Sequence, residues 1–195
     1  MIYLKLNPVG VDVVINDIQR QVSTALNWTD YNAYHRIYKI EKAEGGIIPE
    51  FYTGENEARS GEYEEVYLND NLMASSFFYS QDTVTANDGG HLMDNTISMV
   101  FQVDLNRLNG DNKRADEHVH RDVIRAINDS GHGKVSSLVT KLSNVYSEFD
   151  ITQIRWNDMQ PFHCFRVDIA VNYQFDCCDD CMYQSPITGN DYIFI

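Results

Sequence analysis

The sequence has none of the short motifs that mark common enzyme sites: no glycine-rich phosphate-binding loop, no nucleophile elbow and no zinc-protease helix signature. Sites can be assembled from scattered residues, but without a motif the sequence favours a protein that is not an enzyme and needs no cofactor. No apolar run approaches the roughly 20 residues of a membrane span, and residues 1–6 are too short an apolar stretch for a secretory signal. We therefore expect a protein made in the cytosol that does not insert into a membrane.

Basic residues are scarce. Among 195 residues there are 15 Lys and Arg against 29 Asp and Glu, a net charge of −14. This balance excludes wrapping of nucleic acid by the average surface, because phosphate binding needs clustered cations. Two interpretations of the acidity remain: a solvated surface, or a passage through which DNA slides without sticking. The 43% of hydrophobic residues is enough for a sizeable core.

Two long runs of alternating side chains, Ile97–Leu105 and Phe162–Phe175, predict two strands. In each run the apolar side chains share one face, so we expect that face to be buried. The other face should meet solvent or a partner. Its polar residues are Ser98, Gln102, Asp104 and Asn106 in the first run, and Arg166, Asp168, Asn172 and Gln174 in the second.

Apolar stripes at steps of three and four residues predict helices over Pro8–Asn27 and Ala115–Asp129, and a further helix over Lys134–Phe149. Strands and helices together predict an α+β fold: a mostly antiparallel twisted sheet with long hairpins and two or three helices packed on one face.

Shorter elements complete the prediction. We expect one hairpin from Arg36–Ala43 and Ile47–Tyr52, and another from Tyr63–Leu68 and Ser75–Asp82. The remaining segments are predicted as an aromatic segment packed over the helix end at Trp28–His35, a long loop at Thr85–Asn95 and a short strand at Ile151–Trp156. The chain is then a single domain over residues 1–176, with a hairpin arm at about 36–82, followed by a C-terminal tail over 177–195.

Two groups of side chains suggest metal ligands. Cys178 and Cys181 have the two-residue spacing of zinc sites, and with Cys164 and Cys177 they supply four thiols. Against zinc, Cys164 falls on the non-apolar face of its strand, and reduced cysteines are ordinary in the cytosol. His118 and His120 diverge on a helix, which favours an exposed polar face, and His163 is isolated in the sequence. The main prediction is no metal, with a zinc-stabilised binding or regulatory module as the alternative.

The order of these elements resembles that of bacteriophage tail-terminator and neck (head–tail joining) ring proteins. The segments that carry the resemblance are Val11–Leu26, Arg36–Asp82, Ile97–Leu105, Ala115–Asp129 and Phe162–Phe175. The expected helix Lys134–Phe149 and the cysteine-bearing tail depart from the common pattern. The composition is also similar to that of crAss-like short-tailed phages.

The resemblance implies a structural protein of the virion, made in the cytoplasm of the host bacterium and placed in the phage neck or tail. Copies would close into a ring, a hexamer or dodecamer, that joins the portal or neck to the tail. Adjacent portal, neck or tail proteins would be its partners. Genomic DNA would pass through the ring without specific binding, and the hairpin arm would reach a neighbouring subunit or ring by edge pairing.

Overall fold

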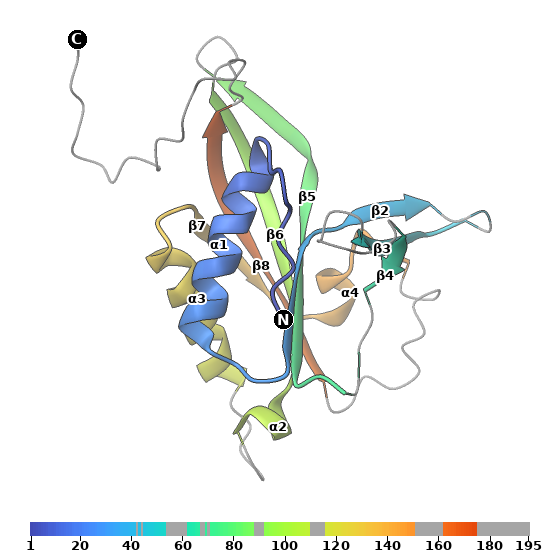
Figure 1. Ribbon diagram of the computed structural model, residues 1–195, viewed down its shortest axis with the longest axis vertical. Helices are drawn as coiled ribbons and strands as arrows, with labels where there is room; N and C mark the ends of the chain where they lie inside the picture. Colours follow the sequence, from blue (N-terminus) through green and yellow to red (C-terminus); the bar gives the residue numbers. More distant parts are fainter. Residues whose placement is uncertain are drawn as a thin grey trace.

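The computed structural model describes residues 1–41, 43, 45–53, 62–66, 69, 71–87, 92–109, 116–150 and 162–174. The helices are α1 (Val11–Leu26), α2 (Leu105–Asn109), α3 (Asp116–Asp129) and α4 (Leu142–Val145). The strands are β1 (Tyr31–Arg36), β2 (Tyr38–Glu41), β3 (Ile47–Tyr52), β4 (Tyr63–Glu65), β5 (Ala74–Asn87), β6 (Leu92–Asp104), β7 (Lys134–Val139) and β8 (Phe162–Gln174). They form a five-stranded sheet, β1-β5-β6-β8-β7, and a three-stranded sheet, β2-β3-β4, that projects to one side (Figure 1).

The α+β prediction is confirmed, and so are its two central strands. Strands β6 and β8 pair along their whole length, from Leu92 opposite Gln174 to Asp104 opposite Phe162. All pairs in the central sheet are antiparallel except β1 with β5, which is parallel. The sheet is therefore mixed but mostly antiparallel.

The predicted helices α1 and α3 cover one face of the central sheet (Figure 1). Their apolar stripes are fully buried at Ile18 and Val22 in α1 and at Val123 and Ile127 in α3. In the sheet beneath, the aromatic rings of Phe101 and Phe165 stack with centroids 5.0 Å apart. Each such side chain stabilises the fold by about 1.5–3 kcal/mol relative to an exposed position.

The second face of the sheet is largely covered too, so the expectation of one wet face is wrong for most of its length. Ser98, Gln102, Asp104 and Asp168 are all buried. Above them lies a second apolar layer that includes Ile37 from the link between β1 and β2, Phe51 from β3, Tyr146 and Phe149 from the α4 region, and Cys164 from β8. Among the polar positions predicted for this face, Asn106, Asn172 and Gln174 are the exposed ones.

The helix predicted over Lys134–Phe149 is wrong. Residues Lys134–Val139 form strand β7, and only Leu142–Val145 are helical. The pairing of β7 with β8 shifts register between Val135 and Ser137, as a β-bulge does. The extra residue leaves Val135 and Leu138, three positions apart, both near α3. This spacing is the one that a helix would produce, which explains the error.

The second predicted hairpin and the loop after it are also wrong. Strand β4 pairs with β3, whereas β5 pairs with β1 and β6, so the turn at Asn69–Asn71 joins two different sheets. The predicted loop Thr85–Asn95 contains the ends of β5 and β6, where Thr85 pairs with Asp94. Residues 84–87 are exposed and Met93 packs only partly against the core, so this part of the hairpin lacks the regular alternation of buried apolar residues that reveals a strand.

Strand β1 was not predicted, because the segment Trp28–His35 was assigned to packing over a helix end. It is a strand whose alternate residues Tyr31, Ala33 and His35 are buried. The first hairpin is confirmed as β2 and β3. The predicted strand Ile151–Trp156 and the tail 177–195 lie outside the described residues.

Candidate functional site

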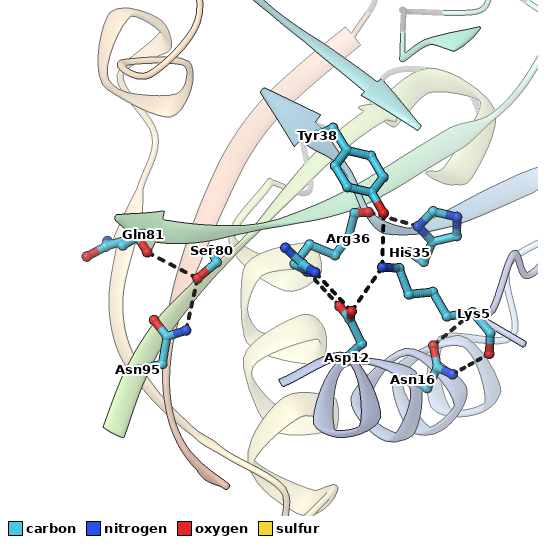
Figure 2. A network of polar contacts seen from close by, with 9 residues as sticks. All are labelled: Lys5, Asp12, Asn16, His35, Arg36, Tyr38, Ser80, Gln81 and Asn95. Atoms are coloured by element: carbon cyan, nitrogen blue, oxygen red, sulfur yellow. Dashed lines mark hydrogen bonds and ion pairs between the residues drawn. The ribbon is translucent and has the colours of Figure 1, made fainter. Parts of the chain in front are cut away.

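The projecting three-stranded sheet, β2-β3-β4, is called the arm below. At its root lies a group of charged residues contributed by three segments (Figure 2). Asp12 of α1, 7% exposed, accepts hydrogen bonds from Arg36 Nε at 2.6 Å and Arg36 Nη2 at 2.9 Å. Lys5 Nζ donates to the same carboxylate at 2.9 Å. One buried carboxylate therefore ties the N-terminal segment and the end of β1 to α1.

Electrostatics hold this junction in its charged form. Burial alone would raise the pKa of Asp12, but the hydrogen bonds and positive charges of Arg36 and Lys5 outweigh it and lower that pKa. Burial would likewise lower the pKa of Lys5, and the Asp12 carboxylate raises it instead. Lys5 Nζ also donates to the Tyr38 hydroxyl at 3.2 Å, which connects the junction to the first residue of β2.

The arm has further attachments to the rest of the molecule. Lys39 forms an ion pair with Glu148, and its ammonium group lies 5.6 Å from the Tyr79 ring centroid. On β3, the Phe51 ring lies 4.7 Å from that of Tyr34. Asp150 N donates to Ile47 O at 2.9 Å. These contacts fix the direction in which the arm projects.

The surface of the arm is aromatic and acidic. Tyr63 is 53% exposed, and its ring lies 4.9 Å from that of Tyr52 and 5.8 Å from that of Tyr38. Glu41 and Glu64 of the same sheet are also exposed. Clustered tyrosines are enriched in protein–protein interfaces, and an acidic surface is unsuited to phosphate binding.

A second polar group lies on the covered face of the central sheet. The Asp168 carboxylate accepts hydrogen bonds from Ser98 Oγ at 2.7 Å and Ser137 Oγ at 2.6 Å. Arg166 Nη2 donates to it at 3.2 Å, and Arg166 Nη1 donates to the Tyr79 hydroxyl at 3.1 Å. Arg166 Nε lies 2.9 Å from Asp168 Oδ1 without hydrogen-bond geometry, as an ion pair. The group crosslinks β5, β6, β7 and β8, which is a structural role.

The prediction of an exposed histidine face holds for His118 but is wrong for His120, which is 4% exposed. Its Nε2 lies 2.9 Å from His163 Nε2 on β8, and the imidazole centroids are 5.1 Å apart. The two ring centroids are farther apart than the two nitrogens by nearly twice the distance from an imidazole centroid to its nitrogen. Each nitrogen therefore lies on the side of its ring that faces the other ring, which is the arrangement of an N–H···N hydrogen bond. Two zinc ligands would instead aim at a common point about 2.0–2.1 Å from each nitrogen.

The tautomer of His120 follows from its surroundings. Among the described residues its buried Nδ1 has no hydrogen-bond partner. A proton on Nε2, donated to His163, leaves no buried donor unsatisfied. Burial lowers the pKa of His120, against the opposing charges of Glu117 and Asp116. The contact with His163 thus fastens α3 to β8 with His120 in its neutral form.

The four thiols of the zinc alternative fall into two groups. Cys164 is buried in the second apolar layer, and burial raises the pKa of its thiol to about 12. A thiol there is protonated at neutral pH, whereas a zinc ligand is a thiolate. Cys177, Cys178 and Cys181 lie outside the described residues. Within the described ranges no three His, Cys, Asp or Glu side chains gather as a metal site.

Sequence reasoning missed the residues that hold the arm. The apolar stripe that predicts α1 says nothing of Asp12, and Arg36 enters the sequence prediction only as the start of a strand. Asp12 comes early in its helix and follows Lys5 by seven residues, but no sequence pattern links either residue to Arg36. Such a junction depends on the long-range folding of β1 onto α1.

Comparisons of the chain with protein-family models, curated proteins and solved structures found no match. In the part of the chain that the structure describes, no helix is long and apolar enough to cross a membrane.

Proposed function

We propose that this protein is a structural component of a phage virion, a subunit of a ring in the neck or tail. The observation that carries the proposal is the order of elements: α1, β1, an inserted arm, the long β5–β6 hairpin, α3 and the closing strands β7 and β8. Within this order, α1, the region from β2 to β5, β6, α3 and β8 correspond to the segments that carry the resemblance to tail-terminator and neck ring proteins, whereas β1 and β7 do not belong to it.

Two physical features support the proposal. The arm is held at a fixed angle by buried ion pairs and ring contacts, so its exposed Tyr63 is preorganised for a neighbour. The net charge of −14 suits a protein beside DNA that must slide and not adhere. The mechanism is assembly: subunits join around a channel, and the arm contacts the next subunit or an adjacent portal, neck or tail protein.

The test is the mass of the native assembly. Purified full-length chain is measured by native mass spectrometry and imaged by negative-stain electron microscopy across a range of protein concentrations. A closed ring of six or twelve copies is expected. A chain that is monomeric at every concentration and also fails to join portal or tail proteins co-expressed with it would overturn the proposal.

A further inference from the structure

On the β1 side, the central sheet ends in residues 1–6, called the N-terminal segment below and drawn in dark blue in Figure 1. Ile2 forms a parallel bridge with Ala33. The bridge consists of two hydrogen bonds, from Tyr3 N to Ala33 O at 2.8 Å and from Ala33 N to Met1 O at 2.9 Å. In such a bridge the backbone groups of Ile2 itself point away from β1. They therefore belong to the outer edge of the sheet.

Helix α1 holds the inner side of the N-terminal segment. Asn16, which is 3% exposed, accepts a hydrogen bond from Lys5 N at 3.2 Å and donates one to Lys5 O at 2.9 Å. Gln19 Nε2 donates to Tyr3 O at 3.0 Å. The two-residue alternation of an extended chain then turns the backbone groups of Leu4, between Tyr3 and Lys5, outward. Among the described residues, the amide of Leu4 has no hydrogen-bond partner.

Apolar side chains accompany this open edge. The exposed ones in the first nine residues are Met1, Ile2, Leu6 and Val9. The opposite edge of the sheet is different, because Val135 N of β7 already donates to Asn128 Oδ1 at 3.1 Å. A strand edge that is held in place and flanked by uncovered apolar side chains favours the addition of another extended apolar chain.

The C-terminal tail over 177–195 contains a sequence of matching chemistry. Residues 192–195, Tyr-Ile-Phe-Ile, are all aromatic or β-branched, and these residue types are enriched in strands. The rest of the tail contains Asp, Asn, Gly and Pro, which are depleted in strands. Residues 192–195 are therefore the part of the tail best suited to pair with a strand edge.

The tail is also long enough to reach this edge. Ile2 lies on a row of paired residues that runs through Ala33, Ser76, Phe101 and Phe165. Gln174 is nine residues farther along β8, about 30 Å along the strands and about 19 Å across four strand spacings from Ile2. The separation is then about 35 Å, whereas residues 175–191 can span up to about 60 Å. A tether that spans the gap favours the tail of the same chain over that of a second copy.

We propose that residues 192–195 add to the central sheet as a strand antiparallel to the N-terminal segment of the same chain. They would bond to the outward backbone groups of Ile2 and Leu4 and cover the side chains of Ile2 and Leu6. The direction follows from the register, because the N-terminal segment runs toward the end of the sheet where Gln174 lies, and the tail enters from that end. The inference is independent of the proposed ring function. It implies that any partner adding a strand at this edge must displace the tail.

The test measures hydrogen exchange of the full-length chain by mass spectrometry, resolved to single amides. The blocking variant is Ile193→Asp with Phe194→Asp, since adjacent side chains take opposite faces of a strand. Its control is Ile187→Asp with Thr188→Asp, which makes the same change in charge elsewhere in the tail. We expect the amide of Leu4 to exchange at least about tenfold faster in the blocking variant than in the original chain and the control.

The amides of Tyr3 and Lys5 report whether the fold is intact. Their hydrogen-bond partners, Ala33 O and Asn16 Oδ1, do not belong to the tail, so both amides should stay protected in every variant. Equal exchange at Leu4 in the original chain and the blocking variant would overturn the inference.

A one-to-one mixture identifies which copy supplies the tail. Isotopically heavy blocking variant is mixed with the original chain, and exchange is measured in the heavy chain. Its Leu4 amide should remain unprotected, because its own tail cannot pair. Protection restored by the mixture would assign the edge to the tail of a second copy and overturn the inference. None of these outcomes decides ring formation, which the native mass measures separately.

Discussion

Replacing Asp12 by Asn should weaken the whole junction at the root of the arm. The Asp12 side chain is 10% exposed and faces Arg36 and Lys5, whose side chains are 28% and 10% exposed. Removing one partner of a buried ion pair costs about 3–5 kcal/mol, because the remaining charge stays desolvated. Asn keeps one acceptor oxygen, and Arg36 can regain some water. We therefore expect a loss of about 2–3 kcal/mol, or roughly 5–10 °C in Tm for a chain of this length.

The stability lost in Asp12→Asn should depend on pH, because Asp12 titrates differently in the folded and unfolded protein. Asp12 has a lowered pKa in the folded protein and an ordinary one, about 3.9, when unfolded. Its contribution to stability is therefore complete above the unfolded pKa and is lost as the pH falls through the lowered folded pKa. The deficit of Asp12→Asn relative to the original chain should be constant near neutral pH and shrink below about pH 4.

Urea unfolding of both proteins between pH 3 and pH 8 measures this deficit, and hydrogen exchange locates it in β2 and the end of β1. The control is Asp122→Asn: the Asp122 side chain is 53% exposed and pairs only with its neighbour Arg121 in the described structure. We expect that control to change stability by less than about 0.5 kcal/mol. An Asp12→Asn deficit below about 1 kcal/mol at pH 7, or one that is undiminished at pH 3, would refute the reasoning.

Three further predictions concern other parts of the molecule. Gly133→Ala should cost about 1–3 kcal/mol in urea unfolding, because its Cβ would lie 2.6 Å from Ile169 Cγ2; an unchanged midpoint would contradict this contact. The original chain should lose stability as the pH falls below about 6.5, since burial lowers the pKa of His120, and His120→Phe should flatten that slope; an equal slope in both proteins would count against the pair. Cys164, with a thiol pKa of about 12, should resist iodoacetamide at pH 8 until the protein is unfolded, as peptide mapping would show; rapid labelling in the folded state would exclude its burial.

The sequence predicts an element correctly where the buried apolar residues of that element all lie on one face. Helices α1 and α3 each bury a single apolar stripe, and β6 and β8 bury alternate residues on the helix side. Strand β7 could not be predicted, because its bulge places the apolar residues Val135 and Leu138 three positions apart, which is the spacing of a helix. The outer part of the β5–β6 hairpin could not be predicted for another reason: its two strands are held together by backbone pairing and by polar contacts such as that of Asn87 with Asp94, which have no hydrophobic period.

The candidate site was less predictable than the fold. Its ion pairs join residues 24 positions apart in Arg36 and Asp12, and 109 apart in Lys39 and Glu148. The sequence shows that charges exist but not which of them meet. The same holds for His120 and His163, which stand 43 positions apart and were treated as unrelated.

The polar residues once expected to meet solvent on β6 and β8 explain why the arm is rigid. Gln102 is buried because Tyr146 and its neighbours lie over it, and its Nε2 donates to the Tyr146 hydroxyl at 3.1 Å. The same layer contains Phe51 and Ile37 of the arm and its approach, so the arm shares a core with the central sheet. A hinged flap would need to expose that core to move. The arm is therefore a fixed projection, and whatever it contacts must meet it in the orientation that Asp12 and this second core define.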